Sequence, residues 1–130
     1  MQKIRKYFNL FFKISNFTMI ILYLYPGSIF GWIVHGNLKS QPQLTRDFFS
    51  ISSNHLYAFL VLSFTAIISY SNNSKKLNYI FLYLLFISIS LELTHLVIPN
   101  RSFQYDDLIG NISGVITSYM LIKFYEFIRR

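Results

Sequence analysis

Cysteine is absent from this sequence of 130 residues. The chain therefore cannot form a disulfide, a thiolate metal site or a cysteine nucleophile, and redox chemistry gives no information about its compartment. Charged residues are also scarce, at 13% of the chain, whereas soluble domains carry about 25%. Hydrophobic residues make up 53%, so a water-facing globule could not cover them. The composition predicts a single domain whose apolar side chains face lipid.

Acidic residues are few as well, and twelve lysines and arginines give the chain a net charge of +7. A basic chain binds nucleic acid when its bases cluster on one soluble face. Here the bases lie at the ends of apolar runs, as in membrane helices that are anchored to an anionic leaflet. We therefore predict the lipid bilayer as a partner and no nucleic acid.

Four apolar runs approach the roughly 20 residues that a membrane-spanning helix needs. They lie at about 9–34, 55–70, 77–98 and 107–127. Pro26 and Gly27 interrupt the first run, and the residue before a proline is disfavoured in a helix. We therefore expect a helix to about Tyr25, followed by a kink or an exit. No small-x-small cleavage site follows this run, which favours a retained span over a signal peptide.

The predicted fold is all-α: one integral membrane bundle of four transmembrane helices that covers residues 1–130. Lysine and arginine predict its orientation, because cytoplasmic loops carry more of them. One side has nine: Lys3, Arg5, Lys6, Lys13, Lys75, Lys76, Lys123, Arg129 and Arg130. The other side has three: Lys39, Arg46 and Arg101. Both termini are therefore predicted to be cytoplasmic, in a multi-pass protein of the inner (plasma) membrane.

This orientation brings polar residues from distant parts of the sequence to one depth, the outer edge of the bilayer. They are His55, Glu92, His95, Arg101, Asp107 and Asn111. An acid at the bilayer centre costs at least ~2.5–3.5 kcal/mol, so Glu92 should face protein or water. We expect Arg101 and His95 to be its partners.

Helical spacing places most of these residues on two helix faces. The faces are formed by Ser88, Glu92 and His95, and by Asp107, Asn111, Gly114 and Ser118. Small residues such as Gly114 and Ser118 let another helix approach closely. Asp107 also suits the first turn of a helix, where a carboxylate meets free N–H groups and the positive end of the helix dipole.

The same residues resemble the C-terminal signature of the VanZ-like family. The family pattern reads roughly E-x-x-Q, a proline, R-[ST]-F and D-x-x-x-N-x-x-G. This sequence has Glu92, His95, Pro99, Arg101, Ser102, Phe103, Asp107, Asn111 and Gly114. A family histidine that opens a span corresponds to His55. The resemblance is specific over about 88–118, and three positions depart from the pattern. They are His95, where glutamine is usual, Ile51, where aspartate is common, and Phe59, where tyrosine is common.

The resemblance implies a small bacterial multi-span membrane protein of the cell envelope. The family is named for an accessory protein of glycopeptide resistance, which is linked to low-level resistance to teicoplanin. No reaction is established for the family. The resemblance therefore implies a location in the cell envelope and a connection with glycopeptide resistance. It does not decide whether the protein is an enzyme.

The outer polar cluster has two interpretations. It could be an outward-facing site for a phosphate or carboxylate group, with Arg101 as the anion clamp and Glu92 as a general acid or base. Alternatively, it is a closed polar network that pins the third loop to two helices. The candidates for ligand binding are His55, Glu92, His95, Arg101, Asp107 and Asn111. The candidates for catalysis are Glu92, Asp107 and His55.

We predict no metal and no cofactor. Glu-x-x-His on a helix occurs in carboxylate bundle sites, but Glu92 and His95 with only His55 beside them form a weak pattern. Each histidine is interpreted instead as an interfacial hydrogen-bonding residue. Five tyrosines are assigned to the aromatic belts at the membrane surfaces: Tyr23, Tyr25, Tyr70, Tyr79 and Tyr105.

Three functions compete. The favoured one is a binding or accessory protein for an anionic lipid-linked or peptidoglycan-related group, with an effect on glycopeptide susceptibility. The second is an intramembrane enzyme that acts on a lipid-linked envelope precursor. The third is a small transporter. It fits least well, because the inner halves of the spans have few ionisable groups and four short spans enclose little space without forming a homo-oligomer.

Overall fold

A computed structural model describes residues 2–128, and this part of the chain contains five α-helices and no β-strand. The helices are α1 (Gln2–Leu24), α2 (Ile29–His35), α3 (Ser53–Tyr70), α4 (Ser74–Thr94) and α5 (Tyr105–Ile128). The predicted all-α class is therefore confirmed.

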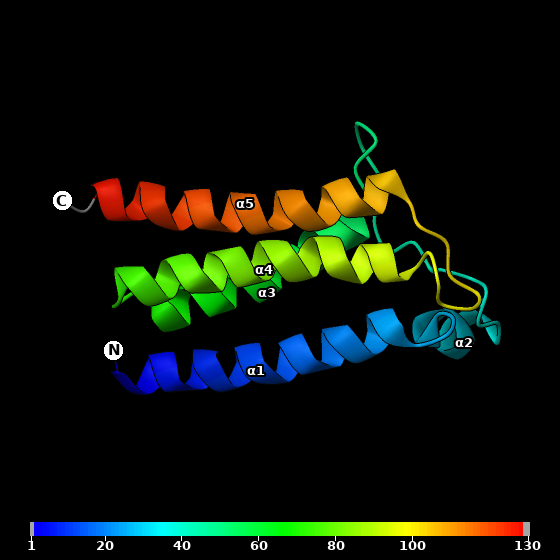
Figure 1. Ribbon diagram of the computed structural model, residues 1–130, viewed down its shortest axis with the longest axis horizontal. Coiled ribbons are helices and arrows are strands. Elements are labelled where there is room, and N and C mark those ends of the chain that lie inside the picture. Colours follow the sequence, from blue (N-terminus) through cyan, green and yellow to red (C-terminus); the bar gives the residue numbers. More distant parts are fainter. Residues whose placement is uncertain (1, 129–130) are drawn as a thin grey trace.

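The four long helices run side by side (Figure 1). The start of α1, the C-terminal end of α5 and the short turn between α3 and α4 lie at one end of the bundle, while α2 and the two longer loops lie at the other (Figure 1). We call these the terminal end and the loop end. Within the bundle, α3 and α5 pack together most closely, and α1 and α4 contact α3 from other sides.

The first apolar run forms two helices instead of one. The break falls where the sequence predicts it: α1 ends at Leu24, and Gly27 then adopts a left-handed φ of +116°. The short helix α2 follows, with the Ser28 hydroxyl accepting the Gly31 N–H at 2.9 Å. The expected helix end at about Tyr25 is therefore confirmed, and the residues after the proline form a separate short helix.

The third helix of the bundle also ends earlier than its apolar run. Helix α4 begins at the Asn73 cap, which accepts the Lys76 N–H at 3.0 Å, and it ends at Thr94. His95 is its C-terminal cap residue. Pro99 disfavours helical geometry just before it, and Asn100 has a left-handed φ of 59°. The chain after Thr94 therefore turns toward α5.

Close packing of α3 against α5 forms the centre of the bundle. A Cβ added at Gly114 would lie 2.5 Å from the Leu56 carbonyl oxygen and 2.7 Å from the Leu60 nitrogen. The Ser118 hydroxyl donates to the Leu60 carbonyl at 2.8 Å. The predicted small-residue face on the last helix is therefore confirmed, and Phe59 is fully buried beside it.

Large apolar side chains cover much of the exterior. Phe17, Phe86 and Phe124, on three different helices, are each more than half exposed. Two helices, Lys3–Leu24 and Ser74–Thr94, are long and apolar enough to cross a membrane by length and composition. This observation supports a membrane protein.

Candidate functional site

The polar residues at the loop end are joined through Asn111 on α5. Its Nδ2 donates to the Ser88 carbonyl of α4 at 3.2 Å, which directs Oδ1 toward α1 and α3. Oδ1 accepts the Tyr23 hydroxyl at 2.8 Å and lies 3.1 Å from His55 Nδ1. Asn111 is fully buried, so one amide links all four long helices.

His55 connects Asn111 to Asp107. The Tyr23 hydroxyl lies 2.7 Å from His55 Nδ1. On the opposite side of the ring, His55 Nε2 lies 3.4 Å from Asp107 Oδ2. Asp107 is in the first turn of α5 and is buried, where a carboxylate is also favoured by the helix dipole.

Glu92 is fully buried and lies on the α4 side of the cluster. Its Oε1 accepts the Gln104 N–H at 3.1 Å and lies 3.3 Å from His95 Nδ1. His95 Nε2 lies 3.2 Å from the Tyr23 carbonyl oxygen. Because a carbonyl can only accept, Nε2 carries a proton. The predicted contact between Glu92 and His95 is therefore confirmed.

Arg101 makes different contacts from those expected. Its Nη2 donates to the Leu22 carbonyl at 2.8 Å and its Nε to the Tyr25 carbonyl at 3.4 Å. These carbonyls belong to the C-terminal end of α1, where free carbonyl groups attract a cation. Among the described residues, Arg101 forms no ion pair with Glu92 or Asp107, whose carboxylates contact the two histidines. The expected ion pair between Arg101 and Glu92 is therefore wrong.

The Arg101 guanidinium still contributes positive charge to the site. Partial burial lowers its pKa from the ordinary value, while the nearby Tyr23, Glu92 and Asp107 act in the opposite direction. An arginine stays protonated at neutral pH under such shifts. Two of its five N–H donors are engaged by α1, so donors are left for an anion.

Tyr23 is the residue of this site that the sequence interpretation missed. Its assignment to an aromatic belt is wrong, because it is only 9% exposed and bonds His55 and Asn111. Its ring stacks on His95 with centroids 5.3 Å apart. Its position in the sequence could have indicated this role, because Tyr23 lies near the end of the first helix, at the same depth as the other polar residues. Tyr79 and Tyr105, by contrast, are largely exposed, as expected of belt residues.

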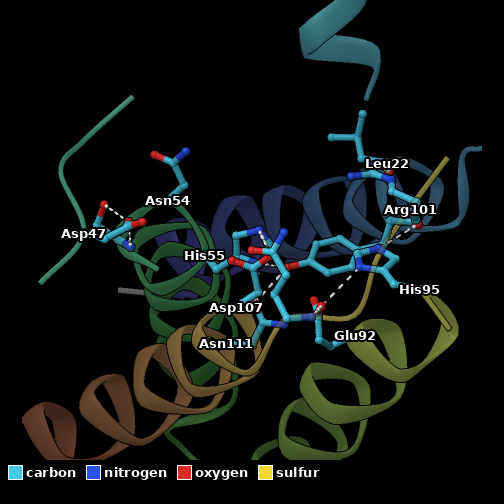
Figure 2. Close-up of polar contacts among 12 residues, drawn as sticks. Leu22, Asp47, Asn54, His55, Glu92, His95, Arg101, Asp107 and Asn111 are labelled. Carbon is cyan, nitrogen blue, oxygen red and sulfur yellow. Dashed lines mark hydrogen bonds and ion pairs between the residues drawn. The ribbon is translucent and has the colours of Figure 1, made fainter. Parts of the chain in front are cut away.

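The first long loop is tied to the start of α3 beside this cluster. Asp47 Oδ1 accepts the Ser53 N–H at 2.9 Å, and Asn54 Oδ1 accepts the Leu44 N–H at 3.1 Å. Figure 2 shows Asp47 and Asn54 on one side of His55 and Arg101 on the other. Asp47 thus caps a helix, and the acid that contacts His55 is Asp107 from α5.

A cavity of about 960 Å³ opens between α1, α3 and the first loop. Apolar side chains of the two helices form much of its wall, including Ile14, Met19 and Val61. His55, His95, Arg101 and Asp107 also line it. Glu92 and Asn111 are not among its lining residues and are fully buried. Part of the cluster therefore faces the cavity, and Glu92 and Asn111 are buried behind it.

This arrangement can perform two kinds of chemistry. A carboxylate that contacts an imidazole can accept or transfer a proton, which applies to Asp107 with His55. The same types of ligand atom bind metal ions. His55, Glu92 and Asp107 each offer one such atom, and these atoms lie within 4.8 Å of one another.

Comparison with known proteins gives one match. The family model described as VanZ/LLP1 matches residues 2–126. No curated protein and no solved structure matches the chain significantly. The matched region covers almost the whole sequence and includes every residue of the polar cluster. The chain therefore belongs to the VanZ/LLP1 family.

Proposed function

We propose that this protein is a multi-pass inner-membrane protein of the bacterial envelope whose outward-facing cavity binds the anionic head of a lipid-linked or peptidoglycan-related precursor. Family membership supports the association with the envelope. The favoured role is binding without turnover, and a change in teicoplanin susceptibility is the expected phenotype.

The dimensions of the bundle support four spans. At about 1.5 Å per residue, the 18 residues of α3 and the 24 of α5 give lengths close to the ~30 Å of a bilayer core. Helix α3 contacts both of the most membrane-like helices, α1 and α4, and α5 contacts α4. Described basic residues gather toward the terminal end: Lys3, Arg5, Lys6, Lys75, Lys76 and Lys123. This distribution supports cytoplasmic termini.

The observation that carries the proposal is the composition of the cavity wall. A lipid-linked ligand has an apolar chain and an anionic head. The cavity has an apolar wall on α1 and α3 and a polar region with Arg101, whose remaining donors suit a phosphate or carboxylate. Apolar contact along the chain would contribute affinity in proportion to the area removed from water, and Arg101 would select the charged head.

A binding measurement with purified full-length protein in nanodiscs tests this proposal. Undecaprenyl phosphate is the probe, and undecaprenol is its uncharged match. Wild type is expected to bind the phosphate at least about tenfold more tightly, since a charge-assisted hydrogen bond contributes about 1.5–3 kcal/mol. Arg101→Gln should remove this preference, while Arg46→Gln, at an exposed loop position, should retain it. Equal binding of both probes by wild type would contradict the proposal.

An intramembrane enzyme is the second candidate, and the contact between His55 and Asp107 at the cavity favours it. Such a pair suits general acid or base catalysis on a bound head group. Incubation with lipid-linked precursors separates the two functions. A product that wild type forms and that Glu92→Gln and Asp107→Asn do not form would establish the enzyme. Binding with no product over long incubation would establish the accessory role.

A further inference from the structure

We propose that His55, Glu92 and Asp107 form a binding site for a divalent transition metal ion, with zinc as the representative ion. The three residues come from α3, α4 and α5, so their meeting point is created by the fold. Their candidate ligand atoms lie within 4.8 Å of one another. One imidazole and two carboxylates form a recognised type of ligand set for such ions.

Glu92 supplies the first independent reason for a cation. The residue is 0% exposed, and its Oε1 is bonded to Gln104 N–H and close to His95 Nδ1. Within residues 2–128, Oε2 has no hydrogen-bond partner although it is buried. A buried carboxylate oxygen without a partner is costly in a low-dielectric interior. Figure 2 shows the Glu92 carboxylate directed from α4 toward the other cluster residues.

The orientation of His55 supplies the second reason. Asn111 Nδ2 donates to the Ser88 carbonyl, so Oδ1 faces His55 and can only accept. The Tyr23 hydroxyl already donates to Oδ1. The His55 Nδ1 contacts are therefore satisfied when Nδ1 carries the proton. In the neutral ring, the Nε2 lone pair then points toward Asp107 Oδ2, and a cation between these atoms would remove their repulsion.

This hydrogen bonding matches that of ligand histidines in metal sites. A metal-bound histidine usually donates its other N–H to a carboxylate, a carbonyl or water, which fixes the ring. Asn111 Oδ1 and the Tyr23 oxygen occupy that position here. His95 belongs to this outer layer as well, because its nitrogens contact Glu92 and the Tyr23 carbonyl.

The distances fit zinc after a small adjustment. Ligands at about 2.0–2.2 Å in a tetrahedron lie about 3.3–3.6 Å apart. His55 Nε2 and Asp107 Oδ2 are already 3.4 Å apart. The longest separation, at most 4.8 Å, would shorten by roughly 1 Å through side-chain rotation. Magnesium and calcium prefer oxygen ligands alone, so the imidazole favours a transition metal.

Three protein ligands leave a coordination position free, as in catalytic zinc sites. His55 and Asp107 line the cavity, while Glu92 lies behind them. The free position would therefore face the cavity. This role of the metal as an anchor for an anionic head rests on the proposed function, whereas metal binding itself does not.

Zinc binding by the full-length protein tests this inference without any lipid. Protein purified without a histidine tag is stripped with a chelator, titrated with Zn²⁺ against a chromophoric competitor, and analysed for retained metal. Wild type should retain about one Zn²⁺ per chain, with nitrogen and oxygen ligands in its X-ray absorption spectrum. Mg²⁺ at the same concentration should not compete. Absence of specific zinc binding to folded wild type would overturn the inference.

Two matched pairs of variants locate the site. Asp107→Asn and His55→Gln should weaken Zn²⁺ binding by more than about 100-fold, beyond the 10–100-fold expected when only an outer-layer residue is lost. Asp106→Asn and His35→Gln, at exposed positions, should bind as wild type does. Unchanged binding in Asp107→Asn and His55→Gln would overturn the site. If these variants do not fold, the wild-type absorption spectrum decides, since a spectrum without imidazole nitrogen overturns it.

The outcomes for metal and lipid are separable. Zinc binding without a preference for undecaprenyl phosphate would retain the metal site and reject the proposed function. A phosphate preference in chelator-treated protein that binds no zinc would retain the function and reject the metal site.

Discussion

The middle and the loop end of the bundle are held together by different interactions. In the middle of the bundle, α3 and α5 approach closely because Gly114 has no side chain, and Phe59 and Leu62 fill the surrounding space. At the loop end, the same helices are connected to α1 and α4 by hydrogen bonds through Asn111 and Tyr23. Packing alone would stabilise both regions. Because apolar packing would be enough at the loop end too, the carboxylates buried there, Glu92 and Asp107, indicate a role beyond stability.

Burial makes this contrast sharper. Apolar burial is stabilising wherever it occurs, whereas buried carboxylates stabilise a fold only when they are well paired. Glu92 has a buried oxygen without a hydrogen-bond partner among the described residues. A purely structural network would be expected to satisfy that atom. The neutral Asn16 Oδ1 and Ser63 Oγ also lack a partner, but a neutral group costs less to bury than a charge. The charge of Glu92 therefore favours a ligand at the loop end.

The largest expected effect comes from filling the packed region. Gly114→Ala adds a Cβ that would lie 2.5 Å from the Leu56 carbonyl oxygen, and backbone atoms cannot move aside cheaply. We expect a loss of about 3 kcal/mol in the free energy of unfolding, at the upper end for overpacked cores. Denaturant unfolding in detergent measures it. Thr117→Ala, exposed on the same helix, is the control, and equal stability of the two variants would contradict the packing account.

Removal of the Asn111 amide should have the next largest effect. Asn111→Ala leaves the buried Tyr23 hydroxyl and His55 without their shared partner. Each buried group left without a hydrogen bond costs about 1–3 kcal/mol, so we expect a loss of roughly 2–3 kcal/mol. Asn78→Ala removes an exposed amide at the terminal end and should change the same unfolding free energy by less than about 0.5 kcal/mol.

These predictions also show what the sequence could and could not provide. Helix type and the two polar faces follow from spacing and composition, because period and burial are linked in a helix. The prediction that Glu92 and Asn111 lie at one depth followed from counting the lysines and arginines on each side of the membrane. The contacts of Arg101 did not, because a choice between a carboxylate and helix-end carbonyls depends on where α1 ends in space.

Tyr23 illustrates the same limit. An amphipathic aromatic residue near a helix end suits both a membrane surface and a buried hydrogen bond. Only the packing of α1 against α3 and α4 separates these alternatives. Likewise, the metal pattern considered from the sequence combined Glu92 with His95 and His55. The fold instead brings Asp107 to His55 and Glu92, and it uses both nitrogens of His95 elsewhere.

A smaller effect is expected from Tyr23→Phe. This substitution keeps the ring that stacks on His95 and removes only the hydroxyl that contacts His55 and Asn111. The free energy of unfolding should fall by about 1 kcal/mol, the usual net contribution of one hydrogen bond. Tyr79→Phe, at an exposed position, should change nothing measurable. A Tyr23→Phe protein as stable as wild type would contradict this account, because the buried hydroxyl would then contribute no net stability.

The central claim is that the polar loop end faces outward, and cysteine labelling tests it most directly. The chain has no cysteine, so single cysteines at two exposed positions, Ser102→Cys and Asn72→Cys, report opposite ends of the bundle. With a membrane-impermeant maleimide, Ser102→Cys should be labelled in intact cells and Asn72→Cys only after lysis. Labelling of Asn72→Cys in intact cells, with Ser102→Cys protected, would contradict the account.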